Sequence, residues 1–283
     1  MKIDDFESIF RSAVKPRYRF RAPDLASVAV VTDMDAAGTA ALIDKVRAFL
    51  RAADPFGRAT YTGIDRDAYA DVPDLLAAIE RVRPDLICAY RNLGRRHDLP
   101  CTLGSRLDSL TQAVDTPVLV LPPPTRANFD ASLRDTRAVM VIADHITGDD
   151  RLVSWGVTLC AEGGALLLVH VEDGVVFDRY ADALSKIPDI DTDVVVDRLR
   201  SKLLQMPRDY IDSVAAELAA HDVNQTITPI VDMGHVVTTY KQLVAKHEVD
   251  LLVFNTKDDL QLAMQGTAYA LAVEIRDRPL LLL

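Results

Sequence analysis

Two glycines, a hydroxyl group and several basic side chains occur together between residues 91 and 105, where they could hold a phosphate group. Gly94 is followed, after nine intervening residues, by Gly104 and Ser105, which open a segment with helical spacing. A helix start offers free N–H groups and the positive end of the helix dipole to an anion. Glycine also lets the backbone approach a ligand closely. Arg91 and Arg95 place positive charge on the same loop. The segment therefore predicts an anion site.

Each of these features also has a purely structural interpretation, and the sequence leaves both open. The Gly104–Ser105 pair is equally expected at a simple helix N-cap. Asp33 ends an apolar run, so its carboxylate either caps the following helix or contacts a ligand. The basic side chains of this loop, among them Arg91 and Arg95, either point into solvent or form part of the anion site. For Arg91, folding onto Asp98 would fill the site, and pointing outward would strengthen it.

Short apolar runs alternate with amphipathic segments along the chain. Strands are expected at 27–32, 58–64, 85–90, 117–121, 138–143, 165–171, 225–231, 250–255 and 279–283. Helices are expected at 3–13, 36–52, 71–81, 104–114, 149–161, 195–221, 236–247 and 265–275. Apolar strands that alternate with helices are typical of mostly parallel sheets covered on both faces. We predict a doubly wound α/β fold, which binds ligands outside the carboxyl ends of its strands.

The second part of the chain repeats the first. Gly266–Thr267 matches Gly104–Ser105, and in both copies a proline-led strand begins 13 residues after the glycine. We predict two related domains, residues 1–124 and 137–283, joined by a stiff proline-led linker at 125–136. The first domain is shorter by about one strand–helix unit. The final strands are expected to pair across the two domains and bury residues 281–283, because an open apolar edge is a liability.

Composition narrows the function classes. The net charge of −10 falls on residues 126–283, which hold 15 basic and 25 acidic residues, and this argues against nucleic-acid binding. The chain lacks an apolar run long enough for a membrane helix, and its first residues do not resemble a signal peptide. Its three cysteines do not have the spacing of a disulfide framework or of a zinc site. We expect a cytoplasmic protein without a metal site. No hydrolase, Walker or metalloprotease motif is present, so we expect no enzyme, with slow ATP hydrolysis left open.

These residues resemble the universal stress protein family in its tandem form. The family signature is Gly-x2-Gly-x9-Gly-[Ser/Thr], followed by a helix and a Pro-Val-Leu-Val-type strand. Gly94, Gly104, Ser105 and the strand at 117–121 match it in order, Asp33 matches the aspartate that ends the first strand, and Arg91 replaces the first glycine. The resemblance implies domains of the adenine nucleotide α-hydrolase-like fold. It implies that Asp33 lies at the adenine or ribose, that both glycines surround the phosphates, and that Ser105 donates to them.

The second copy departs from the signature, with Thr256 aligned to the middle glycine and Val253 to the first. The resemblance thus implies at most one site, in the first domain, for ATP or AMP, with Mg2+ accompanying ATP. The expected function is a non-catalytic, nucleotide-binding stress-response module. The alternative is a ligand-free scaffold of the same fold, and a more distant one is an adenylyl-transfer enzyme. The protein partner, the stress trigger, a homodimer and a ligand of the second domain stay open.

Overall fold

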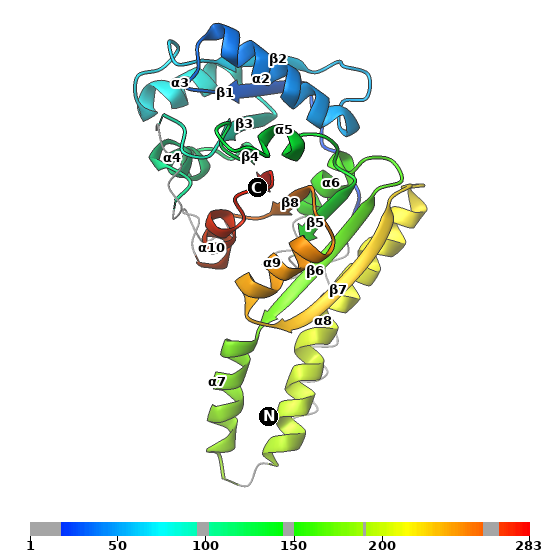
Figure 1. The fold of residues 1–283 in the computed structure, drawn as a ribbon. Coiled ribbons are helices and arrows are strands. Elements are labelled where there is room, and N and C mark those ends of the chain that lie inside the picture. Colours follow the sequence, from blue (N-terminus) through cyan, green and yellow to red (C-terminus); the bar gives the residue numbers. More distant parts are fainter. Residues whose placement is uncertain (1–17, 95–101, 144–149, 189–190, 257–265) are drawn as a thin grey trace.

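A single nine-stranded sheet runs through the whole molecule (Figure 1). The computed structural model describes residues 18–94, 102–143, 150–188, 191–256 and 266–283. The strand order is β2-β1-β3-β4-β9-β8-β5-β6-β7. The strands are β1 (Ser27–Val31), β2 (Thr60–Ile64), β3 (Leu86–Tyr90), β4 (Val118–Leu121), β5 (Ala138–Ile142), β6 (Ala165–Asp173), β7 (Thr226–Gly234), β8 (Leu251–Phe254) and β9 (Leu280–Leu282). All neighbouring pairs are parallel except β4 and β9.

Helices alternate with these strands, as the sequence predicts. They are α2 (Ala36–Phe49) with the 3-10 turn η1 (Leu50–Ala52), α3 (Val72–Val82), α4 (Ser105–Ala113), α5 (Phe129–Ser132), α6 (Asp150–Leu159), α7 (Gly174–Ser185), α8 (Thr192–Ala220), α9 (Val236–Lys246) and α10 (Gly266–Glu274). Aspartate side chains cap several starts by accepting backbone N–H groups, among them Asp35 at α2 and Asp71 at α3. The predicted mostly parallel α/β fold is confirmed.

The two halves of the sheet meet at β4 and β9, a contact that we call the seam. Its antiparallel register pairs Val118 with Leu282, Leu119 with Leu281, and Val120 with Leu280. All of these side chains are buried. Strands that are apolar on both faces must lie inside a sheet with helices on both sides. The predicted pairing of the final strands across the halves is therefore confirmed.

The first half has one strand fewer than the second. Outward from the seam, the first half runs β4-β3-β1-β2 and the second half runs β9-β8-β5-β6-β7. β7 and the helices that lead into it therefore have no counterpart in the first half, which agrees with the predicted missing unit. The core continues from one half into the other, and the domain limits at 124 and 137 stay predictions.

Two helices, α5 and α7, differ from the expectation. The segment 125–136 was expected to be a stiff extended linker, but it contains α5, and Phe129 and Leu133 are buried there. These two side chains anchor the segment because each removes a large apolar surface from water. The sequence analysis also left out α7, which Asp173 caps by accepting the N–H groups of Val175 and Val176. The helix expected at 3–13 lies outside the described residues.

Candidate functional site

The candidate site lies where β1 and β3 end. From β1 the chain continues to α2 and to β2 on one side, whereas β3 continues through α4 to β4 on the other side. Because such crossovers are right-handed, α2 and α4 cover opposite faces of the sheet. The connections diverge between β1 and β3, so this is the switch point at which doubly wound sheets bind ligands. Asp33, Gly94 and Gly104 lie on the loops at this point, and Ser105 is the first residue of α4.

Asp33 joins the two strand ends through its half-buried carboxylate. One carboxylate oxygen accepts the Tyr90 hydroxyl, and the other accepts the N–H of Gly94 at 2.9 Å. The N–H of Asp33 also donates to the Tyr90 hydroxyl oxygen at 3.1 Å. Burial, together with the hydrogen bond to Asp33, raises the pKa of the Tyr90 phenol, which therefore stays protonated and donates. The interpretation of Asp33 as a helix cap is wrong, because Asp35 caps α2.

Both glycines of the loop have backbone conformations that favour glycine. Gly94 has φ +80° and Gly104 has φ +99°. A Cβ atom at Gly104 would lie only 2.9 Å from the Cα of Asn92, which packs directly against it. The N–H of Asn92 donates to the Leu103 carbonyl at 2.7 Å and holds the two parts of the loop together. Ser105, the first residue of α4, is exposed.

Arg106 is the functional candidate that the sequence analysis missed. Its guanidinium lies directly over Gly94, where a Cβ atom would collide with it. Nη2 donates to the Ala70 carbonyl at 3.2 Å, and Cζ lies 5.1 Å from the centre of the Tyr69 ring. Burial raises the pKa of Tyr69 to about 12, so both partners are uncharged at neutral pH. Its place directly after the Gly104–Ser105 pair was the available sequence signal.

Arg91 is buried near the seam and does not point outward, as one of the two interpretations expected; Asp98, its partner in the other interpretation, lies outside the described residues. Its side chain is only 2% exposed, and Nη2 donates to the Ile275 carbonyl at 2.5 Å. Ile275 directly follows α10, and a helix carboxyl end attracts positive charge. Arg91 therefore connects the first half to the second, and this position differs from the expected contact with a nucleotide. Arg95 lies outside the described residues.

The second half has different groups at the corresponding point. The N–H of Thr256 donates to the Leu283 carbonyl at 2.8 Å, just as the N–H of Arg91 donates to the Leu121 carbonyl at 3.1 Å. Thr256 thus occupies the position of Arg91, and its alignment with the middle glycine is wrong. Its hydroxyl also donates to the Leu283 carbonyl, at 2.8 Å. Asp144, which follows the expected strand 138–143 as Asp33 follows the strand 27–32, lies outside the described residues, and so does the loop 257–265.

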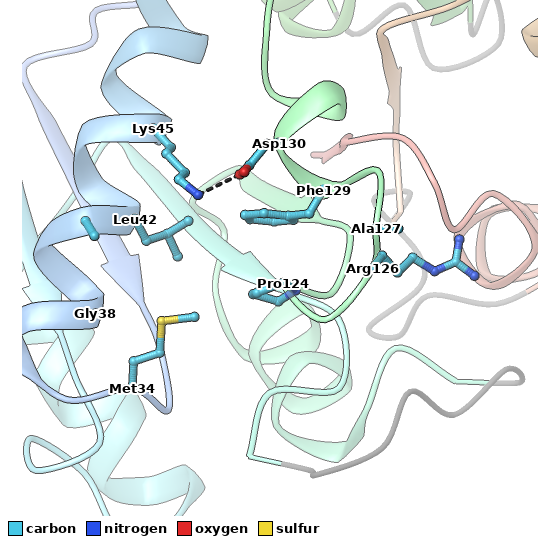
Figure 2. A pocket seen from close by; sticks show the side chains of 10 residues that line it. Met34, Gly38, Leu42, Lys45, Pro124, Arg126, Ala127, Phe129 and Asp130 are labelled. Carbon is cyan, nitrogen blue, oxygen red and sulfur yellow. Dashed lines mark hydrogen bonds and ion pairs between the residues drawn. The ribbon is translucent and has the colours of Figure 1, made fainter.

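A cavity of about 300 Å³ lies beside the site, between α2 and the segment that contains α5 (Figure 2). Leu42 and Phe129 approach each other across it, and Met34, next to Asp33 in the chain, borders one end. Lys45 Nζ and Asp130 Oδ1 form an ion pair of 2.6 Å at its rim. The side chain of Arg126 points away from α2 (Figure 2). The cavity is largely apolar and separate from the glycine loop.

The comparisons with known proteins bear on the fold. The chain is similar to a crystal structure described as a putative universal stress protein from Pseudomonas aeruginosa UCBPP-PA14, with 13% identity, a TM-score of 0.52, and coverage of 92% of this chain and 94% of that one. The chain has the fold of the universal stress proteins. Because each chain covers more than nine-tenths of the other, the similarity includes both halves.

Two further structures show weaker similarity. A universal stress protein from Archaeoglobus fulgidus DSM 4304 is 12% identical, with a TM-score of 0.47 and coverage of 91% of this chain and 85% of that one. A functionally unknown protein from Pseudomonas aeruginosa PAO1 is also 12% identical, with a TM-score of 0.48 and coverage of 92% and 93%. No protein-family model matches the sequence, and neither does any curated protein.

Other site classes find no support among the residues that the structure describes. No three His, Cys, Asp or Glu side chains of this part of the chain come together as a metal site. Within the same ranges, none of the helices combines the length and the apolar composition that crossing a lipid bilayer requires. The glycine loop of the universal stress protein fold, with Arg106 above it, is thus the candidate site with the most specific arrangement.

Proposed function

We propose that the first half binds an adenine nucleotide, with its phosphates at the start of α4, as a non-catalytic regulatory module of a stress response. The observation that carries this proposal is the position of Arg106. Its half-buried guanidinium lies over Gly94, beside the amino end of α4. Within the described residues its contacts are a carbonyl and an aromatic ring, so no carboxylate neutralises its charge.

A phosphate at this point would gain three favourable interactions. The guanidinium offers several N–H donors in a planar arrangement, which suits phosphate oxygens. The start of α4 adds the positive end of the helix dipole and the exposed Ser105 hydroxyl. Gly94 and Gly104 keep the backbone free of side chains. The resemblance to the universal stress proteins supplies the adenine nucleotide as ligand class, with Mg2+ accompanying ATP.

The proposal includes no catalytic step. Both oxygens of Asp33 already accept hydrogen bonds, so this carboxylate is poorly placed to activate a water molecule. The described residues around Gly94 include no histidine that could act as a general base. We therefore propose that nucleotide binding at the start of α4 alters a surface that a partner protein recognises, and that this takes place in the cytoplasm.

Calorimetric titration of the purified chain with ATP, with and without magnesium, tests this function. We expect saturable binding at one site, and Arg106→Gln should weaken it at least about tenfold, since it removes a charge-assisted contact. Arg47→Gln is the matched control, because Arg47 also stacks on a tyrosine, Tyr61, at 4.9 Å. Absence of binding at millimolar ATP, with no nucleotide released on denaturation, would contradict the proposal.

The alternative of a ligand-free scaffold is favoured by one observation. The Arg106 guanidinium lies over Gly94 and the Asp33 carboxylate accepts the N–H of Gly94, so the chain's own side chains already hold this part of the loop. In a scaffold, these contacts would fill the space between the ends of β1 and β3 and leave no room for a ligand. The two functions differ in the effect of Arg106→Gln: a sensor loses affinity for ATP, whereas a scaffold loses only a packing contact and binds no ATP in either form.

A further inference from the structure

The cavity between α2 and the segment that contains α5 has no role in the proposed nucleotide site. Its lining comes from Met34, from one side of α2 and from residues 124–130, which lie between β4 and β5 (Figure 2). Neither the two loop glycines nor Arg106 belongs to this described lining. The volume is about 300 Å³, whereas an apolar cavity of about 150 Å³ is enough to bind benzene. The cavity is therefore large enough for a molecule with one or two rings.

Most of the side chains that line the cavity are apolar. Leu42 of α2 and Phe129 of α5 are only 3% and 6% exposed, and they approach each other across the cavity (Figure 2). Both belong to the hydrophobic core, which holds the two walls in place. Met34 and Pro124 line the cavity as well, and a thioether sulfur makes favourable contacts with aromatic rings. These walls suit a flat aromatic ring.

The rim of the cavity carries one positive and one negative group, which contact each other. Lys45 Nζ lies 2.6 Å from Asp130 Oδ1 and 5.5 Å from the centre of the Phe129 ring. An ammonium group has three donors and a carboxylate has two oxygens, so the pair still offers a donor and an acceptor to a ligand. The two side chains are 45% and 75% exposed, and such an exposed pair adjusts at little cost. The rim thus offers hydrogen bonds without a net charge.

We propose that this cavity binds a small, uncharged aromatic molecule that carries a hydroxyl group, a ligand of the phenol or naphthol class. The ring packs against Leu42 and Phe129, and the hydroxyl lies at the ion pair, where it accepts from Lys45 and donates to Asp130. A ligand carboxylate is disfavoured because Asp130 repels it, and a ligand ammonium is disfavoured because Lys45 repels it. A hydroxyl is both donor and acceptor, so it uses both groups of the rim. This inference does not rest on the nucleotide site.

Calorimetric titration of the full chain with 2-naphthol at neutral pH tests the proposal. This probe has two flat fused rings and a protonated hydroxyl group. We expect one saturable site with a dissociation constant on the order of 0.1 mM, as for a well-placed ligand of about ten heavy atoms. 2-Naphthoate, which has the same rings with a carboxylate, should bind at least about tenfold more weakly. Absence of binding at about 2 mM 2-naphthol, or tighter binding of 2-naphthoate, would overturn the proposal.

Two substitutions on α2 locate the bound probe. Ala41 lines the cavity and is exposed, so Ala41→Phe should fold, fill the cavity with its ring and weaken 2-naphthol binding at least about tenfold. Ala40→Phe is the matched control, because Ala40 is the neighbouring exposed residue of α2 and does not line the cavity. The affinity of this control should equal that of the wild type.

A third substitution tests the part of the rim. Lys45→Met keeps the length of the side chain and removes its donor, so 2-naphthol should bind about threefold to tenfold more weakly. If Ala41→Phe leaves the affinity unchanged, the probe binds elsewhere on the protein. If Lys45→Met leaves it unchanged, the ion pair does not recognise the hydroxyl. Either result would contradict the proposal.

Discussion

An aspartate holds the start of a neighbouring strand in both halves of the molecule. In the first half, Asp85 accepts the N–H groups of Ala26 and Ser27, each at 2.9 Å, just where β1 begins. In the second half, Asp250 accepts the N–H of Ala138 at 2.9 Å, at the first residue of β5. The two halves thus keep the same contact at the amino ends of their central strands. This contact serves the sheet, so it is expected wherever the fold is kept.

At the carboxyl ends of the same strands, the halves differ. Arg91 reaches across the seam to Ile275, whereas Thr256, in the same position, bonds to Leu283 within its own half. The first half also has the glycine loop and Arg106. The comparison teaches that the two halves share the aspartate that holds the amino ends of their strands, and that they differ in the residue that follows the carboxyl ends of β3 and β8.

The substitution with the largest expected effect tests whether the two halves unfold together, as one cooperative unit. Leu281→Ala removes a fully buried side chain that pairs with Leu119 across the seam and with Val253 within the second half. We expect a loss of about 2–5 kcal/mol in the free energy of unfolding. In urea denaturation, circular dichroism and the fluorescence of the single tryptophan, Trp155 of the second half, should shift together.

The control for this prediction is Phe56→Ala, an exposed position of the first half. Its effect should stay within about 0.5 kcal/mol. Two separate transitions, of which only the one reported by Trp155 shifts in Leu281→Ala, would show that the seam does not couple the halves.

Substitutions at Arg91 and Thr256, the corresponding positions at the ends of β3 and β8, should lower the free energy of unfolding by smaller and unequal amounts. Arg91→Met removes a charged donor from the buried Ile275 carbonyl, and we expect a cost of about 1.5–3 kcal/mol. Thr256→Val removes a neutral hydrogen bond, for an expected cost of about 1 kcal/mol. Urea denaturation of both variants gives the comparison. Greater stability of Arg91→Met would mean instead that the burial of the charge costs more than its contacts contribute.

The smallest expected effect concerns Asp108 in the first turn of α4, where the second half has Ala270 at the same distance from its glycine. Burial raises the pKa of Asp108 above its ordinary 3.8, although the Thr102 hydroxyl donates to it and acts in the opposite direction. The folded state therefore binds the proton more tightly than the unfolded state. The ionised carboxylate destabilises the fold at neutral pH, and this penalty disappears as the pH falls toward 3.8.

Asp108→Asn should accordingly raise the melting temperature at pH 7. The gain should be less than about 1 kcal/mol, because the carboxyl group is only half-buried. The difference between variant and wild type should shrink on acidification, which melting curves between pH 7 and about 4 would show. A lower melting temperature of Asp108→Asn at pH 7 would mean that attraction to the amino end of α4 dominates.

The order of strands and helices could be predicted because it depends on local patterns. Runs such as residues 86–90 are apolar on both faces, and helix starts carry aspartate caps. The repeat with its 13-residue spacing also predicted that the final strands pair, since both had to bury their edges. α7 was missed although Asp173 and the spacing of Val176, Phe177 and Tyr180 were available as signals.

The candidate site could be predicted only in part, because it depends on where long side chains end. Gly94 and Gly104 are backbone requirements, and the spacing of glycines indicates them directly. A guanidinium can reach about 7 Å from its own backbone, so sequence neighbours do not reveal its partner. Arg91 was expected at the loop but lies against Ile275, and Arg106 was overlooked but lies over Gly94. Asp33 was expected either to cap the following helix or to contact a ligand, and the structure shows its carboxylate accepting the N–H of Gly94 and the hydroxyl of Tyr90.

The position of β9 in the sheet has a consequence for the synthesis of the chain. β9 is the last described strand in the sequence, yet it is the central strand of the nine. β4 is complete at Leu121, whereas β9 begins only at Leu280. At ordinary ribosomal rates, about 10 to 30 s pass between the two. During this time the nascent first half exposes one edge of β4, and it is then most open to pairing with a wrong strand and to chaperones that cover such edges.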